Sequence, residues 1–468
     1  MIHPLPPRFQ TQRSALRPVR RTLLISLLVG SASSVLAAEG PCDIYEAAKT
    51  PCVAAHSTTR ALYAAYNGAH YLVRRTSEKQ TKVIYPLSAG GVANMAAQDS
   101  FLNGKAGTVS LIYDQSPQKN NLPKSPRCNY LEAGLESDVS KGLTKLDGHP
   151  VLGIYITGAT PADIWATQRI SSVAYRNNKT KGIATGNMAE AMYAVVDGKR
   201  YSNACCFDYG NGETTGNDDG NGTMEAIYWG TNITWGGKGD GTGPWIAADL
   251  ENGMFKADKG GNGSSNQSYP NDKTVNANYA TLVLKGPAAN TYGMKAGDAQ
   301  SGKLVTMWNG ARPSPNYYPK KLQGAIFLGT GGDGSPGGTG TFFEGAMTNG
   351  NPPDSIDDKI QANIIAAGYG RQTTSVLSRH ADQSMVHVRT LFSTNLATIE
   401  YDLASSARAE LEIVDLRGAR LAMISNGNVA AGMHQATWDA SNARKGVYLA
   451  RLVLDGAVAW SGSILVGR

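Results

Sequence analysis

Two carboxylates stand two residues apart in the stretch Gly243–Phe255, which reads GPWIAADLENGMF. If this stretch is a strand, its side chains alternate between two faces, and Asp249 and Glu251 share one face with Trp245 and Ala247. Like charges about 7 Å apart on one face are unfavourable unless a ligand or a cleft uses them. The structural alternative is an edge strand whose polar face is solvated.

A second carboxylate-bearing stretch makes acid–base chemistry the stronger hypothesis. Asp333 lies in the Gly-rich segment Gly329–Gly340, which follows a predicted strand, and such a loop lets the backbone approach a ligand. A phosphate cradle is the alternative, but neither a GK[ST] sequence nor a βαβ pattern accompanies the loop. Retaining glycosidases need a nucleophilic carboxylate and an acid/base carboxyl about 5 Å apart. The candidates for these roles are Asp208, Glu225, Asp249, Glu251, Asp333 and Glu344.

Electrostatic repulsion would divide the two roles. Two charges about 5 Å apart at an effective dielectric near 20 repel by roughly 3 kcal/mol, which is about 2 pKa units. One carboxyl can then stay protonated near pH 6 while the other remains ionised. The spacing alone does not say which carboxyl is which.

The five cysteines add an unusual pair. Cys205 and Cys206 are adjacent, and a disulfide between them would close a rigid eight-membered ring with an apolar surface suited to a sugar face. The alternative is two separate thiols, one of them paired with Cys128. Cys42 and Cys52 bracket a short loop, where a disulfide would stabilise the fold by roughly 3 kcal/mol. No CxxC, HExxH or paired-His spacing occurs, so no metal site is predicted.

Residues 1–38 have the organisation of a secretory signal peptide, with arginines before the apolar run Leu23–Val29 and small residues at Val35–Ala38. We therefore expect a secreted protein, either extracellular or at the cell surface. No later stretch approaches 18 consecutive apolar residues, so the mature chain is predicted to have no membrane span. Removal of the five signal arginines leaves 39 basic against 37 acidic residues, and nucleic-acid binding is not predicted.

The composition favours a β protein rich in turns, since the chain has 54 Gly, 21 Tyr against 8 Phe, and only 17% charged residues. One helix is predicted, with Ser355 as its cap, isoleucines at helical spacing, and Gly368 at its end. The expected strands are Lys82–Leu87, Thr108–Tyr113, His149–Ile156, Met188–Val196, Met224–Trp229, Thr281–Leu284, Lys303–Trp308 and Gly324–Leu328, with a hairpin over Ala61–Val73.

The composition changes after Tyr369, and this change suggests the domain organisation. We expect a signal peptide over 1–38, a catalytic β-sandwich over 39–371, a linker over 372–384 and a small β-sandwich over 385–468. The last domain holds few candidate catalytic groups, so a spacer or sorting role is expected for it. Its predicted strands are Ala409–Val414, Ala419–Ile424, Gly446–Leu454 and Ser461–Val466.

Several stretches, among them GPCDIYEAAKTPC, CCFDYGNGET, MEAIYWG, GPWIAADLENG, GAIFLGTGGDGS and QANIIAAGYG, resemble the catalytic domain of the α-L-arabinofuranosidase B family, glycoside hydrolase family 54. The resemblance covers about Gly40 to Arg371. It implies an all-β fold, with a jelly-roll-like β-sandwich followed here by the small Ig-like β-sandwich. It also implies an exo-acting retaining enzyme, without a cofactor or metal, that releases terminal α-L-arabinofuranosyl residues from arabinoxylan, arabinan or their oligosaccharides in hemicellulose.

The resemblance assigns roles to individual residues. Glu251 corresponds to the nucleophile and Asp333 to the acid/base. It also implies the disulfides Cys42–Cys52 and Cys205–Cys206. The residues that would contact the sugar are Cys205, Cys206, Trp235, Asp249, Asn252 and Gly332.

Two departures from the fungal pattern are visible. Cys128 has no nearby partner, so we expect a free thiol, and the tail is too short for an arabinose-binding β-trefoil. The tail sequence WDASNARKGVYLARL resembles C-terminal sorting modules of secreted Gram-negative bacterial proteins, which predicts contact with a secretion machinery. Two functional alternatives remain open: a non-catalytic carbohydrate-binding sandwich, and a glycosidase for galactofuranose or xylose.

Overall fold

The computed structural model describes, besides Met1, residues 39–159 and 169–371 and, in the C-terminal region, 387–393, 396–403, 406–415, 419–455 and 457–466. The predicted signal peptide apart from Met1, and the whole of the predicted linker, therefore lie outside the described residues. The described helices are all too short or too polar to cross a lipid bilayer.

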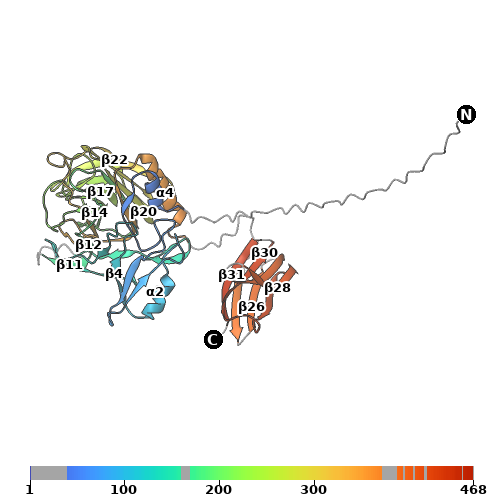
Figure 1. Ribbon diagram of the computed structural model, residues 1–468. Coiled ribbons are helices and arrows are strands. Elements are labelled where there is room, and N and C mark those ends of the chain that lie inside the picture. Colours follow the sequence, from blue (N-terminus) through green and yellow to red (C-terminus); the bar gives the residue numbers. More distant parts are fainter. Residues whose placement is uncertain are drawn as a thin grey trace.

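Two antiparallel sheets form the larger unit, and they face each other as a sandwich (Figure 1). The first sheet contains, in spatial order, β1 (Cys52–Ser57), β24 (Gly340–Asn349), β13 (Glu190–Asp197), β20 (Tyr279–Gly286), β21 (Thr291–Asp298) and β22 (Val305–Ala311), and β10 (Ile154–Ile156) also pairs with β24. The second contains β12 (Tyr175–Asn177), β23 (Ala325–Leu328), β14 (Asp208–Gly212), β15 (Glu225–Gly230), β17 (Trp245–Asp249) and β18 (Met254–Phe255). This arrangement agrees with the predicted all-β sandwich.

Alternation along the strands places the main core between these sheets. On β13, Met192 and Ala194 belong to the largest buried apolar cluster, together with Ile227 of β15 and Ile246 of β17. Successive strand residues point to opposite faces, so Tyr193 of β13 joins a different cluster on the far side of the first sheet. Both β13 and β15 are buried on both faces, which explains why they read as nearly continuous apolar runs.

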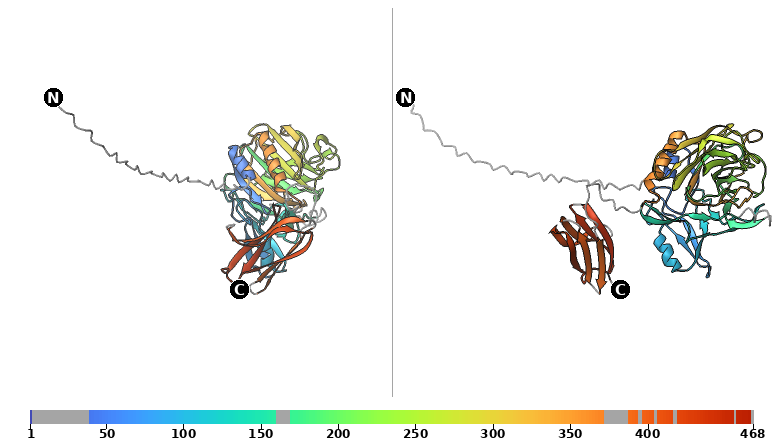
Figure 2. Two further views of the ribbon diagram at one scale, coloured as in Figure 1. Left: turned by 90° about the vertical axis from the view of Figure 1, so that its right-hand side faces the viewer. Right: turned by 180° about the vertical axis from the view of Figure 1, so that it is seen from behind.

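Helices cover the outer face of the first sheet. In α4 (Asp354–Ala367), the isoleucines at the predicted spacing are buried against that face, and α1 (Pro41–Ala47) packs beside α4 (Figure 2). Gly368 ends α4 in the left-handed conformation with a φ of 77°, as predicted. The predicted cap was wrong, because the N-cap is Pro353 and Ser355 already lies inside the helix.

Smaller sheets pack around the sandwich, together with α2 (Met95–Leu102). They are built from β2 (Tyr71–Arg75), β3 (Thr81–Ile84), β4 (Gly107–Ile112), β5 (Leu122–Pro123) and β7 (Ser137–Asp138); β6 (Leu131–Leu135) with β11 (Ile170–Val173); β8 (Leu143–Leu146) with β9 (His149–Leu152); and β16 (Lys238–Asp240) with β19 (Ser268–Lys273). The predicted hairpin over Ala61–Val73 is wrong. Residues 61–70 form turns, and only β2 is a strand, because β2 pairs with β3 and β4 rather than with the preceding segment.

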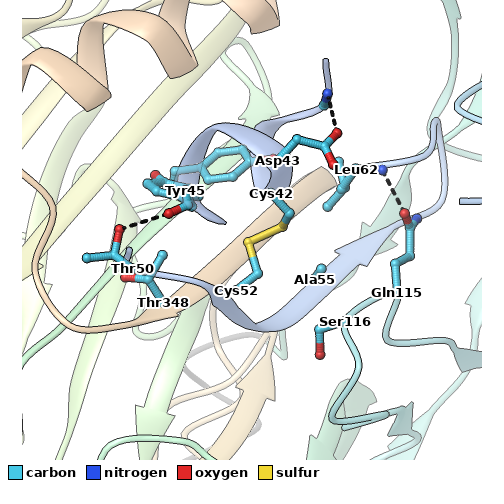
Figure 3. Close-up of a disulfide and its surroundings, with 12 residues drawn as sticks. Cys42, Asp43, Tyr45, Thr50, Cys52, Ala55, Leu62, Gln115, Ser116 and Thr348 are labelled. Carbon is cyan, nitrogen blue, oxygen red and sulfur yellow. Dashed lines mark hydrogen bonds between the residues drawn. A yellow bond between two sulfur atoms is a disulfide. The ribbon is translucent and has the colours of Figure 1, made fainter. Parts of the chain in front are cut away.

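The Cys42–Cys52 disulfide fastens α1 to the start of β1 (Figure 3). Its χ3 angle is −93° and its Cα–Cα distance is 5.6 Å, values that lie within the usual disulfide range. Asp43 supports the same corner, because its Oδ2 accepts hydrogen bonds from the backbone N–H groups of Gly40 and Ala64.

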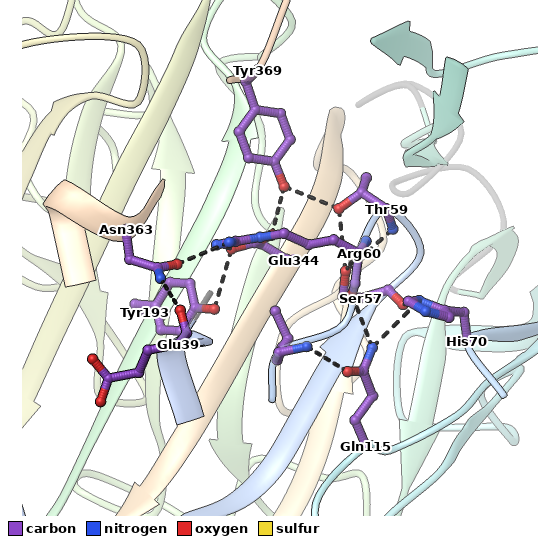
Figure 4. A network of polar contacts seen from close by, with 11 residues as sticks. Glu39, Ser57, Thr59, Arg60, His70, Gln115, Tyr193, Glu344, Asn363 and Tyr369 are labelled. Atoms are coloured by element: carbon purple, nitrogen blue, oxygen red, sulfur yellow. Dashed lines mark hydrogen bonds and ion pairs between the residues drawn. The ribbon is translucent and has the colours of Figure 1, made fainter. Parts of the chain in front are cut away.

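A buried ion pair joins the first sheet to the helical layer (Figure 4). Arg60 donates from Nε and Nη2 to the two oxygens of Glu344 on β24, both at 2.7 Å, and from Nη1 to Asn363 of α4 at 2.9 Å. The hydroxyls of Tyr369 and Tyr193 complete the hydrogen bonding of the Glu344 carboxylate. Both charged groups are thus paired and bonded, as burial requires.

Replacing Glu344 by glutamine is expected to lower the free energy of unfolding by about 3–5 kcal/mol, because the substitution leaves the buried Arg60 charge unpaired. Urea denaturation measures the loss. The matched control is Asp240→Asn, which breaks the exposed pair with Lys273, in which each side chain is 53% exposed; the expected loss there is small, because solvent screens an exposed ion pair. Equal losses in the two variants would contradict this account of the buried pair.

The C-terminal strands form two sheets with their own core. One sheet contains β25 (His387–Ser393), β26 (Leu396–Leu403) and β29 (Gly432–Asp439), and the other β28 (Arg420–Val429), β27 (Ala407–Val414), β30 (Gly446–Leu454) and β31 (Ala457–Val466). Among the described residues these strands pair only with one another, and the result is the predicted small sandwich. The exact boundary between the two predicted domains stays a prediction.

Candidate active site

The turn after β17 carries the first two carboxylates. β17 ends at Asp249, and the chain reverses through Glu251 and Asn252, whose φ values are 70° and 54°. Few residues other than glycine adopt this left-handed conformation. The backbone N–H of Glu251 donates to Asp249 Oδ1 at 3.2 Å. The strand was predicted to carry both carboxylates and to end with a turn at Asn252-Gly253. It ends earlier, at Asp249, because the left-handed turn already includes Glu251 and separates β17 from β18.

The predicted division of faces along β17 is confirmed as far as Asp249. Ile246, Ala248 and Leu250 enter the core between the sheets. Ala247 lies on the outer face of the second sheet, in a small cluster with Cys206, and Asp249 shares that face. Glu251 reaches the site from the turn rather than from the strand face.

Asp333 approaches from the Gly-rich loop after β23. Its Oδ1 accepts hydrogen bonds from the backbone N–H of Ser335 at 2.8 Å and from the Ser335 hydroxyl at 2.7 Å. Burial raises the pKa of Asp333, and the two Ser335 hydrogen bonds oppose part of that rise. A Cβ on Gly331 would lie 3.1 Å from Asp333 Oδ1 and 3.4 Å from Cys206 Sγ, and Cys206 Sγ is 3.6 Å from Asp249 Oδ2, so the structure brings the loop and turn carboxylates to the same disulfide.

The Cys205–Cys206 disulfide lies beside Asp249 and the Gly-rich loop. Cys206 Sγ is 3.6 Å from Asp249 Oδ2, and the backbone on the other side bonds to the Gly-rich loop, because Gly337 N–H donates to the Cys205 carbonyl at 2.8 Å. Partly buried Trp235 packs against the same cluster. The disulfide is thus a fixed apolar wall of the site. Cys128 is buried and has no disulfide partner.

The sulfurs of Cys205 and Cys206 and a carboxylate oxygen of Asp249 lie within 4.8 Å of one another, which is a metal-like spacing. The donor set does not fit a metal ion, because both sulfurs belong to a disulfide and neither can be the thiolate that a metal requires.

Asn252 and Gly332 flank the two carboxylate-bearing segments. The Asn252 side-chain amide donates to Asp218 Oδ1 and to Asn221 Oδ1, both at 3.2 Å. Gly332 needs to lack a side chain, since a Cβ there would stand 2.1 Å from a carboxylate oxygen of Glu213. Their predicted contacts with a sugar stay predictions.

Two of the six candidate carboxylates lie outside this site. Glu225 is fully buried and pairs with Arg312 and with Lys320, the latter at 3.1 Å. Glu344 is in the ion pair with Arg60 described above. Both are structural, because buried cations pair with them.

Asp208, at the start of β14, is the fourth carboxyl of the cluster. It is 1% exposed and shares a hydrogen bond with Asp249. Burial and the charge of Asp249 raise its pKa well above the usual value. Asp208 is therefore the member of this pair that keeps its proton when Asp249 ionises.

Glu213 and Arg176 belong to the site but were not predicted from the sequence. Glu213 follows β14 directly and is fully buried, and its Oε1 accepts a hydrogen bond from the Thr223 hydroxyl at 2.6 Å. Arg176 of β12 is 1% exposed, and it donates to the Gly332 carbonyl at 2.6 Å and to the Glu213 carbonyl. Glu213 belongs to the quoted CCFDYGNGET stretch, but nothing in its spacing from Glu251 indicates contact.

Crowding of buried carboxyls is the main electrostatic property of the site. Burial, followed by the charges of Glu213, Asp249 and Asp333, raises the pKa of Glu251 to about 12. Burial and the charge of Asp333 raise the pKa of Asp249 to about 8. The free site therefore holds several protons at neutral pH, which suits a general acid, and a nucleophilic carboxylate must first lose its proton.

The raised pKa of Asp249 makes a testable prediction about stability. An unfolded Asp ionises near pH 4 while the folded group keeps its proton to about pH 8, so this group destabilises the fold increasingly as the pH rises through that window. Asp249→Asn removes this contribution, and its stability relative to wild type should rise by roughly 2–4 kcal/mol between about pH 5 and pH 8. Urea denaturation at both pH values measures the difference in the free energy of unfolding between the variant and wild type. Asp358→Asn, on the exposed side of α4, is the control, and a difference that does not change with pH would contradict the prediction.

Comparison with known proteins decides the family. A family model described as "Alpha-L-arabinofuranosidase B, catalytic" matches residues 41–370. The chain belongs to the α-L-arabinofuranosidase B family. A curated family member, the probable α-L-arabinofuranosidase B of Aspergillus fumigatus, is 48% identical over 350 residues, which are 73% of this chain and 64% of that protein. The chain thus spans slightly less than two thirds of the length of this curated relative.

Solved structures agree with the family assignment. A glutamate-to-glutamine mutant of a GH54 α-L-arabinofuranosidase, soaked with 4-nitrophenyl α-L-arabinofuranoside, is 36% identical with a TM-score of 0.65, over 84% of this chain and 74% of that chain. An arabinofuranosidase complexed with arabinofuranosyl-α-1,2-xylobiose is 33% identical, also with a TM-score of 0.65, over 90% and 82% of the two chains. The predicted resemblance to the family's catalytic domain is confirmed.

Proposed function

We propose that this protein is an exo-acting, retaining α-L-arabinofuranosidase that removes terminal α-L-arabinofuranosyl residues from arabinoxylan, arabinan and their oligosaccharides. The observation that carries the proposal is the convergence of the Glu251 turn and the Asp333 loop beside the Cys205–Cys206 disulfide. The complex of a structural relative with arabinofuranosyl-α-1,2-xylobiose supports the substrate class.

In this proposal the reaction has two steps. Glu251 attacks the anomeric carbon while Asp333 gives its proton to the leaving oxygen, and a glycosyl ester of Glu251 forms. Asp333, now ionised, takes a proton from a water molecule that cleaves the ester, and arabinose leaves with its configuration retained. The disulfide and Trp235 would bound a pocket for one sugar, and Asp249 and Asn252 would bind its hydroxyls.

The test uses the purified full chain with aryl α-L-arabinofuranoside, aryl β-D-galactofuranoside and aryl β-D-xyloside, and NMR of the first anomer released. We expect turnover of the arabinofuranoside, with the α-anomer appearing first. Preference for either other glycoside would replace the substrate assignment. Binding to arabinan without turnover of any of the three would indicate a carbohydrate-binding module instead.

For the C-terminal region we propose a spacer or sorting role in a secreted protein. Three features support this role: the separate core of the region, the signal-peptide organisation of residues 1–38, and the resemblance of residues 385–468 to C-terminal sorting modules. The proposal includes recognition of the C-terminal sandwich by a secretion machinery.

Deleting the residues after Arg371 is expected to leave kcat/KM for an aryl arabinofuranoside within about twofold of wild type, because the family match ends at residue 370 and the two cores are separate. Export or surface attachment in the producing cell should change. The assay compares purified proteins and cell fractions side by side. A large loss of activity in truncated protein with an unchanged circular dichroism spectrum would show that the tail takes part in catalysis.

A further inference from the structure

Glu213 has one carboxylate oxygen with no ordinary hydrogen-bond donor. Its Oε1 accepts from Thr223, but its Oε2 is buried and receives no hydrogen bond from a donor group among the described residues. The group that meets this carboxyl is the carboxyl of Glu251, within hydrogen-bonding reach. A buried carboxylate oxygen without a donor is costly, so a proton between the two carboxyls is needed.

Glu213 also contacts the segment that carries Asp333. Its Oε2 occupies the space where a side chain of Gly332 would be, since a Cβ there would lie 2.1 Å away. Arg176 fixes this contact, because one side of its guanidinium donates to the Gly332 carbonyl and the other to the Glu213 carbonyl. Arg176 is itself held by Asn178, whose Oδ1 accepts from Nε at 2.6 Å. Glu213 is therefore held between the two predicted catalytic segments.

The Glu213–Glu251 pair works best with a single proton. With two protons, Glu251 cannot attack a sugar. With none, two buried like charges in contact repel each other strongly. With one proton, an ionised Glu251 can accept an O–H hydrogen bond, which is among the stronger kinds in proteins.

We propose that Glu213 is a positioning residue for the reaction: it takes the proton of the Glu251 carboxyl when substrate binds and then donates that O–H to the Glu251 carboxylate. This inference rests on the proposed function. One O–H bond breaks on Glu251 and one forms on Glu213, so the pair keeps one proton and the charge is unchanged. Developing positive charge at the anomeric carbon favours the ionised form of Glu251 and drives the transfer.

The resting charges agree with this direction of transfer. Burial raises the pKa values of both carboxyls, but their mutual hydrogen bond lowers that of Glu213 and raises that of Glu251. The free site therefore keeps the proton on Glu251, and Glu213 is the group ready to accept it. Such a pair titrates in two steps that belong to both residues.

The kinetic test compares Glu213→Gln and Glu213→Leu in the full chain. In Glu213→Gln the amide still donates a hydrogen bond to Glu251 but cannot accept its proton, so kcat should fall about 3–10-fold. In Glu213→Leu the side chain does neither, so kcat should fall about 100-fold or more with KM little changed. The acid limb of the pH profile of kcat should move to higher pH in Glu213→Gln and further in Glu213→Leu. The matched control is Glu190→Gln, a buried glutamate of β13 hydrogen-bonded by Asn211, which should leave the limb in place.

A second readout does not depend on turnover. Carbon-13 NMR of protein labelled at glutamate carboxyls should show Glu251 titrating in two steps in wild type and in one intermediate step in Glu213→Gln. An identical Glu251 titration in both proteins, or a folded Glu213→Leu variant with wild-type kcat and pH profile, would overturn the proposal. Absence of activity in wild type would instead reject the proposed function, and the NMR result would still decide whether the carboxyls share a proton.

Discussion

Replacing Glu251 by glutamine is expected to lower kcat for an aryl α-L-arabinofuranoside by about 10⁴-fold or more, because the amide cannot form the glycosyl ester. The side chain is nearly isosteric, and Glu251 is 5% exposed in a turn fixed by its own backbone bond to Asp249, so the fold should persist. Stopped assays with purified variant, followed by thermal unfolding, measure both properties.

Azide separates loss of the nucleophile from general damage to the site. In Glu251→Gly, which leaves the space of the carboxylate empty at a φ of 70° that glycine tolerates, azide can occupy that space, and the arabinosyl azide that forms should have the inverted configuration. Glu225→Gln is not a suitable control, because it breaks a buried ion pair; Glu190→Gln lies outside the site and serves instead. Near-wild-type turnover of Glu251→Gln would remove Glu251 from the role of nucleophile.

Replacing Asp333 by asparagine should produce the second-largest loss, about 10²–10⁴-fold, and the loss should depend on the leaving group. The rate should fall most for natural oligosaccharides, because their departing oxygen needs a proton. It should fall less for aryl glycosides whose leaving groups are acidic phenols. Since the asparagine amide cannot activate water, azide should restore turnover and give a product of retained configuration. The alkaline limb that Asp333 imposes on kcat/KM should disappear with it.

A uniform loss for all leaving groups, without recovery by azide, would contradict the acid/base role. Ser335→Ala is a graded companion variant, because it removes one of two hydrogen bonds to Asp333 Oδ1 and keeps the backbone bond. Its expected effect is a modest rise of the Asp333 pKa, seen as a shift of the alkaline limb to higher pH, since the lost bond stabilised the ionised form.

The sequence predicted the strands of the sandwich better than the geometry of its turns. Ile246 and Ala248 enter the core as their alternation required, because burial of apolar faces dominates strand placement. The left-handed conformations of Glu251 and Asn252 could not be predicted, since neither residue type demands them. The failure over Ala61–Val73 has a similar cause, because pairing with distant β4 decides where β2 begins.

Chemical type alone could not separate the carboxylates of the site from the structural ones. Glu225 and Glu251 are the same residue type, yet partners far along the chain, Arg312 and Lys320, neutralise Glu225. The pairing of Glu213 with Glu251 was missed for the same reason, since it depends on β14 and β17 lying on either side of β15 in one sheet. Residue types and spacing placed Glu251 and Asp333 among six candidates, and only the family resemblance assigned them the roles of nucleophile and acid/base in advance.

The two ends of the larger unit lie together, and this has a consequence for how such enzymes diversify. Glu39 at its start accepts a hydrogen bond from Asn363 of α4 near its end, and α1 packs beside α4 on the face of the first sheet that points away from the carboxylates. A partner sequence can therefore be fused at either end without crossing the path of the substrate. The larger unit is portable: recombination can exchange the region C-terminal to residue 371 while the geometry of the candidate site stays unchanged.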